Sequence, residues 1–503
     1  MEEIELKLLV PEPARKQVRR QLDSWGSQPA VHIDSVYFDT ADGKLASRNC
    51  SLRVRRREDG SGAHWVQTLK SGDALAALSH RQEWEVAVSG PRPRLVGLPD
   101  WPLQALLGEG PAHLVRLFRT RFERTERTVQ FGGARIEVAF DEGSISAGRA
   151  SEPICELELE LRDGPVIAVF DLALTLVGRG SLALALLPAP ESKAWRGRRL
   201  AHRNRVTRQP VPADGEEFSA LLQGQANRLD IDPARRIVAH GVQTVLANVQ
   251  GAALGEDVEY VHQARVALRR ARAALRALGA ARGPDDAVGR DLRWMADCFG
   301  AVRDWDVLLS HTLPKVFESG GLQHNELQQL LRRAQARRAR EQLRLRSTLG
   351  GVRFARTALR LLRWAEEPSA PGALSLQRSL HKLQRGYAKL VAAAADLTRL
   401  PPPKLHRLRI LAKRQRYALE LLASSWPVAA PARTLKALSR LQQLLGRIND
   451  AQVALSLLPS VTRSNQVLRA AERWCDGVVR TTLPKVRQRL KRLARRLPLT
   501  ANA

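Results

Sequence analysis

Charged and apolar residues alternate from the start of the chain, where Glu3, Glu5 and Lys7 are separated by apolar residues. Residues two apart in a β-strand share a face, so this pattern predicts a strand with one charged and one apolar face. Glutamate and leucine alternate in the same way in residues 155–161. Carboxylates that line a common cavity must bind metal, pair with cations or take up protons, so two such strands predict a functional cavity.

The alternation recurs often enough to predict an eight-stranded antiparallel sheet. An open sheet with a solvated polar face is the alternative for any single strand. Since many of the opposite faces are apolar, we favour a closed barrel, which leaves room for side chains or one small ligand. The predicted strands are residues 2–10, 33–39, 50–57, 64–70, 81–88, 115–129, 134–142 and 152–161.

The charged face of this sheet carries acids and bases together. Arginine and lysine bind phosphate oxygens through charge-assisted hydrogen bonds. Glutamate clusters hold Mg²⁺ or Mn²⁺, which bridge to phosphates and orient water. The combination therefore predicts a metal–polyphosphate site. The residues of the predicted face are Glu3, Glu5, Lys7, Tyr37, Asp39, Arg53, Arg55, Thr68, Lys70, Arg81, Glu83, Glu85, Arg119, Arg121, Arg135, Glu137, Glu156, Glu158 and Glu160.

Residues 1–200 resemble the CYTH family, the triphosphate tunnel metalloenzymes. The segments that carry the resemblance are Glu3-x-Glu5-x-Lys7, Tyr37-Phe38-Asp39-Thr40, Leu52-Arg53-Val54-Arg55, Thr68-Leu69-Lys70, Arg81-x-Glu83, residues 152–160 and Ser192-Lys193-Ala194-Trp195-Arg196-Gly197. The resemblance implies a tunnel-shaped barrel with flanking helices that hydrolyses triphosphates with Mg²⁺ or Mn²⁺.

The resemblance also implies roles for individual residues. Metal binding is expected for Glu3 and Glu5, and for two of the three residues Glu156, Glu158 and Glu160. Direct catalytic roles are expected for Glu3, Glu5, Lys7 and Lys70. The residues expected to bind the substrate phosphates are Lys7, Arg53, Arg55, Lys70, Arg81, Arg119, Arg121 and Lys193.

The second half of the chain has a different composition and a helical periodicity. Residues 1–200 are nearly neutral, so residues 201–503 carry almost all of the net charge of +30. Such a basic region is expected to bind a polyanion. We predict a barrel domain at 1–200, a linker at 201–217 and a helical domain at 218–495.

An internal repeat places two basic stripes on predicted helices. In each stripe, basic residues follow a histidine at intervals that fall on one helical face. A basic stripe is usually a solvated face, but two related stripes that both begin with histidine favour an anion site. We expect Asp304 and Asp450, further along each repeat, to cap helices. The stripes are His262, Arg265, Arg269, Arg272 and Arg276, and His406, Arg409, Lys413 and Arg416.

Residues 218–495 resemble the CHAD domain, the conserved-histidine α-helical domain. The matching segments are His262-x-x-Arg265-Val266-x-x-Arg269-Arg270, Arg303-Asp304, His406-x-x-Arg409, Lys413, Arg416-Tyr417-x-x-Glu420 and Gly446-x-x-Asn449-Asp450. The resemblance implies two four-helix bundles related by pseudo-twofold symmetry, with a basic groove that binds inorganic polyphosphate. The residues expected to bind it are His262, Arg265, Arg269, Arg270, Arg272, His406, Arg409, Lys413, Arg414 and Arg416.

Composition argues against several other classes of protein. The four cysteines lie far apart with no CxxC pair, which disfavours a zinc site or a disulfide framework. No run of about 18 apolar residues predicts a transmembrane helix, and the acidic start is unlike a signal peptide. We therefore expect a cytoplasmic protein. Aromatic residues make up 5% of the chain, so stacking platforms for nucleic-acid bases are scarce, and no specific nucleic-acid partner is expected.

The sequence as a whole predicts an inorganic triphosphatase that hydrolyses tripolyphosphate to diphosphate and phosphate. The helical domain is expected to bind long-chain polyphosphate. The alternatives are a non-catalytic polyphosphate-binding protein, or a triphosphatase that acts on thiamine triphosphate or nucleoside triphosphates.

Overall fold

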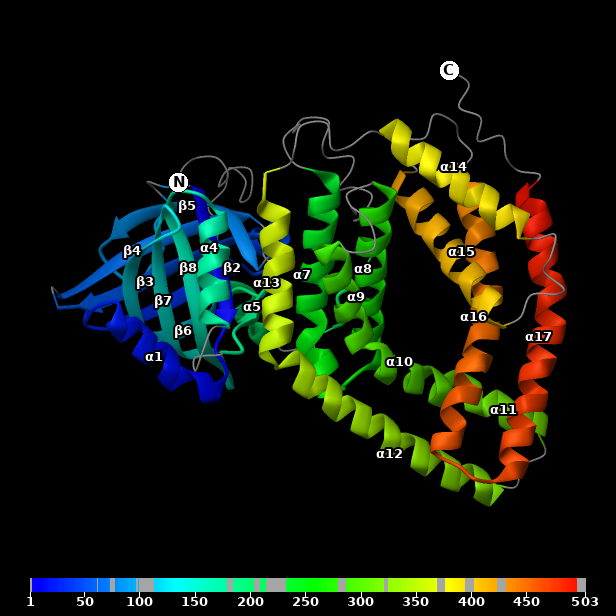
Figure 1. The fold of residues 1–503 in the computed structure, drawn as a ribbon. Helices are drawn as coiled ribbons and strands as arrows, with labels where there is room; N and C mark the ends of the chain where they lie inside the picture. The colour runs from blue at the N-terminus through cyan, green and yellow to red at the C-terminus, as the bar shows by residue number, and fades with distance from the viewer. Residues whose placement is uncertain are drawn as a thin grey trace. The chain divides into compact units, whose positions relative to one another are not determined.

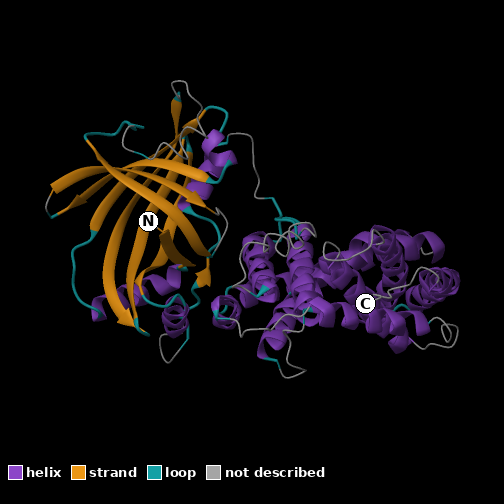
Figure 2. Ribbon diagram, turned by 90° about the horizontal axis from the view of Figure 1, so that it is seen from above, coloured by secondary structure: helices purple, strands orange, loops and turns teal. Residues whose placement is uncertain are grey.

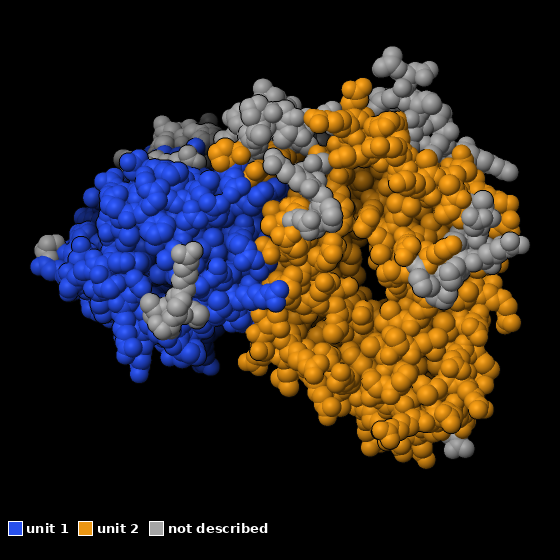
Figure 3. All heavy atoms as spheres, viewed as in Figure 1, with its two compact units in different colours: residues 1–210, 349–367 blue, residues 211–348, 368–503 orange. Residues whose placement is uncertain are grey.

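The chain forms two compact units, which Figure 3 colours separately. One unit comprises residues 1–210 and 349–367, and the other comprises residues 211–348 and 368–503. The structure is a computed structural model that describes residues 2–60, 62–72, 77–95, 98, 113–178, 184–202, 209–213, 232–278, 286–320, 324–368, 376–393, 402–422 and 431–494.

The first unit is built around a closed antiparallel barrel, which confirms the predicted fold class (Figures 1 and 2). Each strand pairs with its neighbours in the order β5-β4-β3-β2-β6-β7-β8-β1, and pairing of β1 with β5 closes the ring. The strands are β1 (Glu2–Leu9), β2 (Val31–Thr40), β3 (Cys50–Asp59), β4 (Gly62–Gly72), β5 (Leu78–Val88), β6 (Leu114–Phe131), β7 (Ala134–Ala147) and β8 (Ala150–Asp163), with β9 (Leu187–Pro188) added beside β1.

The alternation that predicted the strands separates two environments in the barrel. Apolar residues of β2, β3 and β4 pack under Leu45 of the short helix α2 (Lys44–Ser47) and under Leu98, so this outer face is a core. The charged residues between them point inward. A strand whose two faces meet such different surroundings has a fixed register, because a slip of one residue would exchange every side chain between them.

Helices cover parts of the barrel. Helix α1 (Arg15–Ser24) packs on β6, and α4 (Ile167–Leu176) packs on β7 and β8. Helix α5 (Lys193–Ala201) contacts β6, β7 and β8, and the hydroxyl of Ser192 caps its first turn by accepting a hydrogen bond from Trp195 N at 3.2 Å. A Cβ on Gly197 would overlap the ring of Phe118, so α5 approaches β6 as closely as a glycine permits. This close packing places Lys193, the first residue of α5, at the charged face of the barrel.

A helix from the middle of the basic half belongs to the barrel unit. Helix α13 (Val352–Glu366) packs on α4, which is apolar around most of its circumference. The guanidinium of Arg363 holds both carboxylate oxygens of Asp171, with Nε–Oδ1 and Nη2–Oδ2 distances of 2.6 and 3.1 Å. Arg356 donates a hydrogen bond to the carbonyl oxygen of Gly178. The sequence patterns did not predict that residues 349–367 group with the barrel, and the domain boundaries at 200 and 218 stay predictions.

The second unit is mostly helical, as predicted, with α7 packed on α8 and α15 packed on both α8 and α16. A short π-helix continues α10 into α11, a feature that often marks functional sites. The pseudo-twofold relation between two bundles stays an expectation. The helices are α7 (Pro233–Leu254), α8 (Val258–Ala277), α9 (Ala287–Cys298), α10 (Gly300–Val307), the π-helix Leu308–Thr312, α11 (Leu313–Gly320), α12 (His324–Leu349), α14 (Leu376–Ala392), α15 (Pro402–Leu422), α16 (Pro431–Leu457) and α17 (Asn465–Ala494).

Two predicted helix caps are wrong. Asp304 lies inside α10 and Asp450 lies inside α16, so neither residue caps a helix. Among the described residues of this unit, Asp232, Asp257 and Asp286 do cap helices, since they accept backbone hydrogen bonds at the starts of α7, α8 and α9. Among the residues that the structure describes, no helix combines the length and the apolar character needed to cross a membrane.

Candidate functional site

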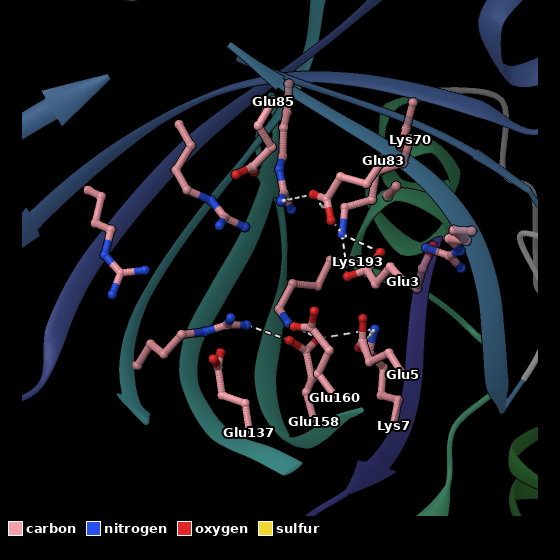
Figure 4. A pocket seen from close by; sticks show the side chains of 18 of the residues that line it. Glu3, Glu5, Lys7, Lys70, Glu83, Glu85, Glu137, Glu158, Glu160 and Lys193 are labelled. Atoms are coloured by element: carbon pink, nitrogen blue, oxygen red, sulfur yellow. Dashed lines mark hydrogen bonds and ion pairs between the residues drawn. The ribbon is translucent and has the colours of Figure 1, made fainter. Parts of the chain in front are cut away.

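The barrel encloses a charged cavity of about 190 Å³. Its walls carry acids and bases in nearly equal number, and Figure 4 shows their side chains pointing into a common space. The lining residues are Glu3, Glu5, Lys7, Tyr37, Ser51, Arg53, Arg55, Arg57, Lys70, Arg81, Glu83, Glu85, Arg124, Glu126, Glu137, Glu158, Glu160, Arg162, Ser192, Lys193 and Ala194.

The first strand contributes two carboxylates and an ammonium, all largely buried. Lys70 on β4 lies 2.7 and 2.8 Å from the two carboxylate oxygens of Glu3. Burial would raise the pKa of the Glu3 carboxyl, but Lys70 and Arg53 together outweigh it and lower the pKa, so Glu3 is held ionised. The Lys7 ammonium lies 3.0 Å from Glu5 Oε1 and 3.1 Å from Glu158 Oε1. Although burial opposes its charge, these two carboxylates raise the pKa of Lys7.

Lys193 is the centre of a buried acidic cluster. Its Nζ lies 2.6 Å from Asp141 Oδ2 and 2.7 Å from Glu158 Oε1, and it also contacts Glu156. Oxygens of these three carboxylates lie within 4.8 Å of one another, a spacing that could hold a metal ion. Here the Lys193 ammonium supplies the positive charge. The carboxylate of Glu158 is held well below its usual pKa, because Lys193, Lys7 and Arg124 outweigh its burial.

A row of three carboxylates crosses the adjacent strands. Glu160 on β8 is the register partner of Glu5 on β1 and of Glu137 on β7. Side chains directly opposite in an antiparallel pair lie about 5 Å apart at Cβ, and like charges there repel. Burial, together with Glu3, Glu5 and Glu137, raises the pKa of Glu160 to about 8, although Arg162 opposes this. Burial and Glu158 likewise raise the pKa of Glu5.

This row has the chemistry of a site for a hard divalent cation. Carboxylate oxygens are the ligands that Mg²⁺ and Mn²⁺ prefer, and a bound dication would relieve the repulsion that now favours protonation of Glu160. The residues present therefore fit a metal held by Glu5 and Glu160, with Glu3, Glu137 and Glu158 close by.

Arginines line the opposite part of the wall. Arg53 lies 3.6 Å from Glu83, and burial, which lowers its pKa, is outweighed by Tyr37 and Glu83. Arg55 makes no ion pair or hydrogen bond through its side chain among the described residues. Burial, Arg53 and Arg124 together lower its pKa to about 10. For Arg55, burial and its like-charged neighbours outweigh the nearby Glu85 and Tyr37, and an anionic ligand would stabilise its charge.

Most of the barrel residues proposed from sequence line this cavity. They are Glu3, Glu5, Lys7, Arg53, Arg55, Lys70, Arg81, Glu158, Glu160 and Lys193. Whether each one binds metal or substrate stays a prediction, since their positions alone do not test it.

Three proposed residues lie elsewhere. Arg119 and Arg121 lie on the outer side of β6, where both pair with Asp34 and where the Arg121 side chain is 62% exposed. Glu156 faces inward, but Lys193 and Arg196 cover it, and it is fully buried away from the cavity. The sequence pattern predicts the wrong inner face for β6, because the residues that point inward near this end are the apolar Phe118 and Phe122.

Sequence reasoning missed two cavity residues on β6 for the same reason. The inward residues of β6 beyond Phe122 are Arg124 and Glu126. Arg124 holds Asp141 through Nε–Oδ1 and Nη2–Oδ2 contacts of 2.7 Å each, and it also contacts Glu158. Both residues share the face of Phe122, because residues two apart in a strand point to the same side. The pattern would predict them if the inner face were allowed to include an apolar residue.

The helical unit contains a second cavity, an open groove of about 1090 Å³. Both repeats contribute to it, so the two sequence stripes converge on one surface. The lining residues are His262, Arg265, Arg269, Arg303, Asp304, Val307, Leu308, His311, Thr312, Lys315, His406, Arg409, Lys413, Gln442, Gln443, Gly446, Arg447, Asn449, Asp450, Val453, Ala454, Trp474, Val478, Thr481 and Thr482.

Like charges crowd this groove. Burial lowers the pKa of Lys413 to about 6, helped by Arg409, Arg269 and Arg265 and opposed by Asp450. Burial and the neighbouring Arg269 also lower the pKa of Arg265. Cations destabilised in this way by one another gain free energy when a polyanion binds among them.

The two histidines are not equivalent. His262 is partly buried, and burial together with Arg303 lowers its pKa to about 4, so it is uncharged at neutral pH. His406 Nδ1 lies 3.1 Å from Asn449 Oδ1. Asn449 occupies the repeat position of Arg303, so each histidine meets a different partner at the same place.

Four of the proposed polyphosphate-binding residues lie outside the groove lining. Arg270 pairs with Glu420 at 3.1 Å, and Arg416 donates a hydrogen bond to Gln442 Oε1 at 2.8 Å. Both guanidinium groups lie over the ring of Tyr417. Arg272 and Arg414 lie apart from the groove as well.

Comparison with known proteins agrees with the domain order expected from the motifs. Residues 1–179 match the CYTH domain, and residues 236–459 match the CHAD domain. The chain is 31% identical over 183 residues to an inorganic triphosphatase of Haemophilus influenzae. That match covers 35% of this chain and 49% of the relative, so the chain spans about half the length of the curated relative.

Two solved structures are also similar. The CHAD domain from the plant Ricinus communis is 29% identical, with a TM-score of 0.41, and the match covers 56% of this chain and 95% of that one. A putative adenylyl cyclase from Hippeastrum, described as having a dominant triphosphatase activity, is 22% identical with a TM-score of 0.27. That match covers 39% of this chain and 95% of the other.

Proposed function

From a chain that carries a CYTH domain followed by a CHAD domain, we propose a metal-dependent inorganic triphosphatase. The barrel cavity would hydrolyse tripolyphosphate to diphosphate and phosphate. The groove of the helical unit would bind long-chain polyphosphate.

The observation that carries the proposal is the division of the barrel wall into an acidic row and a basic side. Glu5, Glu137 and Glu160 lie opposite one another on one side, and Arg53 and Arg55 line the other. Arg162 pairs with both Glu137 and Glu160 and offsets part of the repulsion between these carboxylates. A divalent cation would bring positive charge to the carboxylates, and a phosphate chain would bring negative charge to the arginines. The relative from Haemophilus influenzae, an inorganic triphosphatase, supports the same substrate class.

Individual residues have distinct tasks in this proposal. The metal, Mg²⁺ or Mn²⁺, would neutralise charge on the phosphate oxygens and activate or orient water. Glu5 and Glu160 would hold it, together with Glu3 or Glu158. Arg53, Arg55 and Arg124 would orient the chain of phosphates. Lys7 and Lys193 hold Glu158 in a fixed position, so the ligand set would be preorganised before substrate arrives.

The cavity favours a bare phosphate chain over a nucleotide or thiamine triphosphate. Its volume of about 190 Å³ is below the range of about 300–1,000 Å³ common for pockets that bury drug-sized ligands. Tyr37 is the only aromatic residue among the described lining residues. A nucleobase would find little apolar surface to stack on there.

The groove favours a polyanion without bases for a related reason. Its cations repel one another, and Trp474 is the only aromatic side chain among its described lining residues. A single-stranded nucleic acid gains about 1–3 kcal/mol per stacked base on aromatic platforms, which this groove offers at one position. Long polyphosphate is therefore the proposed ligand, and a cytoplasmic location, with its reducing environment, suits the unpaired cysteines.

A substrate panel tests the proposed activity. Purified full-length protein would be assayed with Mg²⁺ or Mn²⁺ against tripolyphosphate, ATP, thiamine triphosphate and long-chain polyphosphate. We expect the highest kcat/KM with tripolyphosphate. Preference for ATP or thiamine triphosphate would move the enzyme to another triphosphate class. Binding of polyphosphate without hydrolysis of any substrate would instead support a non-catalytic binding protein.

A further inference from the structure

A second arginine cluster lies beside the groove on three helices. Arg272 and Arg276 are four residues apart on α8 and share one face of it. Arg293 comes from α9 and Arg414 comes from α15, and both of these helices pack on α8. None of the four lines the groove, and none makes an ion pair or hydrogen bond through its side chain among the described residues.

The four guanidinium groups repel one another. Burial lowers the pKa of Arg276 to about 10, and Arg414, Arg272 and Arg293 all act in the same direction. Burial and Arg293 lower the pKa of Arg272, which Asp297 opposes only in part. The Nε of Arg272 is buried and has no hydrogen-bond partner among the described residues. A protein that folds in spite of this repulsion keeps four guanidinium groups ready to donate hydrogen bonds to an anion.

The cluster is separate from the groove although both share α8. Arg269 belongs to the groove, and Arg276 lies seven residues further, about 10 Å along the helix axis. Between them, Arg270 turns toward Glu420 and is neutralised by it. A short anion can therefore occupy one site without reaching the other, whereas a long chain can occupy both.

We propose that Arg272, Arg276, Arg293 and Arg414 form a second anion-binding site, which takes the part of a polyphosphate chain that extends beyond the groove. The inference rests on the proposed polyphosphate-binding function of the groove. Two linked sites raise the affinity for any chain long enough to engage both, because binding at the second site becomes intramolecular. The arrangement therefore selects for chain length.

The test compares three double variants of the full-length protein in EDTA. Arg276→Gln/Arg293→Gln removes half of the cluster, and Arg265→Gln/Arg269→Gln weakens the groove. Arg332→Gln/Arg333→Gln removes the same charge from an exposed part of α12 and serves as the matched control. Binding of short and long polyphosphate chains is measured by calorimetry at several salt concentrations, and melting temperatures are recorded.

We expect Arg276→Gln/Arg293→Gln to weaken binding of long chains about tenfold or more beyond the control and to leave short chains unaffected. The salt dependence for long chains should fall by roughly two units, one for each arginine that no longer neutralises a phosphate. Because the substitution relieves repulsion, the melting temperature should rise relative to that of the control. A solvated arginine face would give none of these differences.

Each outcome separates this proposal from the function of the groove. Long-chain affinity and salt dependence equal to those of the control would overturn the second site. If Arg265→Gln/Arg269→Gln retains short-chain binding while the cluster variant loses long-chain binding, the groove assignment fails and the cluster remains an anion site. Tighter binding of single-stranded DNA than of polyphosphate at matched charge would overturn the proposed ligand.

Discussion

At the scale of single residues, the barrel cavity balances cations against carboxylates, and Arg55 is the exception. Lys7, Lys70 and Lys193 each contact carboxylates, whereas Arg55 forms no such contact among the described residues. Its neighbours Arg53 and Arg124 add repulsion. A residue in this state should contribute more to ligand binding than to the stability of the empty protein.

Replacing Arg55 with alanine should lower kcat/KM for tripolyphosphate by about one to two orders of magnitude. That decrease corresponds to one charge-assisted hydrogen bond of about 1.5–3 kcal/mol. Arg121→Ala is the matched control, because Arg121 lies on the outer face of the same barrel. Steady-state kinetics that give the two variants equal kcat/KM would mean that the substrate does not bind in this cavity.

Lys413 should make polyphosphate binding dependent on pH. With its pKa lowered to about 6, Lys413 is mostly uncharged in the free protein slightly above neutral pH. A polyanion among Arg265, Arg269, Arg409 and Lys413 favours the charged form, so binding should take up a proton, and uptake should vanish well below pH 6. Calorimetry in two buffers of different ionisation enthalpy measures this uptake. Its absence in the wild type, or its persistence in Lys413→Arg, would contradict the prediction.

At the scale of elements, alternation predicted the strands well and the inner face of β6 poorly. Six other strands present charged residues to the lumen, as the pattern indicates, whereas the described residue of β2 that lines the cavity is Tyr37. On β6 the inward residues change from Phe118 and Phe122, which meet α5, to Arg124 and Glu126, which meet the cavity. Only the position of α5 decides where this change occurs. A prediction that places every charged residue in the lumen takes no account of α5, which lies about 70 residues later in the sequence and covers Phe118 and Phe122.

Helix α5 should depend on Lys193 to hold it in the barrel. Replacing Lys193 with methionine leaves the carboxylates of Asp141 and Glu156, both fully buried, without their shared cation. Removing one partner of a buried ion pair costs about 3–5 kcal/mol, so the melting temperature should fall markedly. The exposed Lys44 on α2 provides the control Lys44→Met, which should change stability by less than about 0.5 kcal/mol. Equal melting temperatures would show that the cluster is not held by Lys193.

The packing of α13 on α4 should also be measurable through its ion pair. Arg363→Asp places a carboxylate against Asp171 and should lower the free energy of unfolding. Solvent screening limits the effect to about 1 kcal/mol, because the Asp171 side chain is 40% exposed. The exchanged pair Asp171→Arg/Arg363→Asp should recover most of this decrease. Hydrogen exchange in α4 provides the readout, and failure of the exchanged pair to restore protection would argue against the ion pair.

At the scale of the whole molecule, composition and repeats predicted that the chain has two different halves. They did not predict which helices and strands belong to each compact unit. The change from a neutral to a basic half indicated two functions, and the repeat indicated that two stripes meet in one groove. The amphipathic pattern of α13 gave no indication that its partner is α4, since an apolar helical face does not specify which apolar surface covers it. Register, cavity walls and the Lys193 cluster likewise depend on contacts between distant segments.

The most direct test of the central claim is the initial rate of phosphate release from tripolyphosphate by the full-length protein. With Mg²⁺ or Mn²⁺ we predict turnover that EDTA abolishes and that added metal restores. Glu5→Gln should lower kcat about 100-fold or more, because it removes a metal-binding carboxylate, whereas Glu58→Gln, on an exposed part of β3, should not. A full rate in EDTA, or a wild-type kcat for Glu5→Gln, would contradict the account.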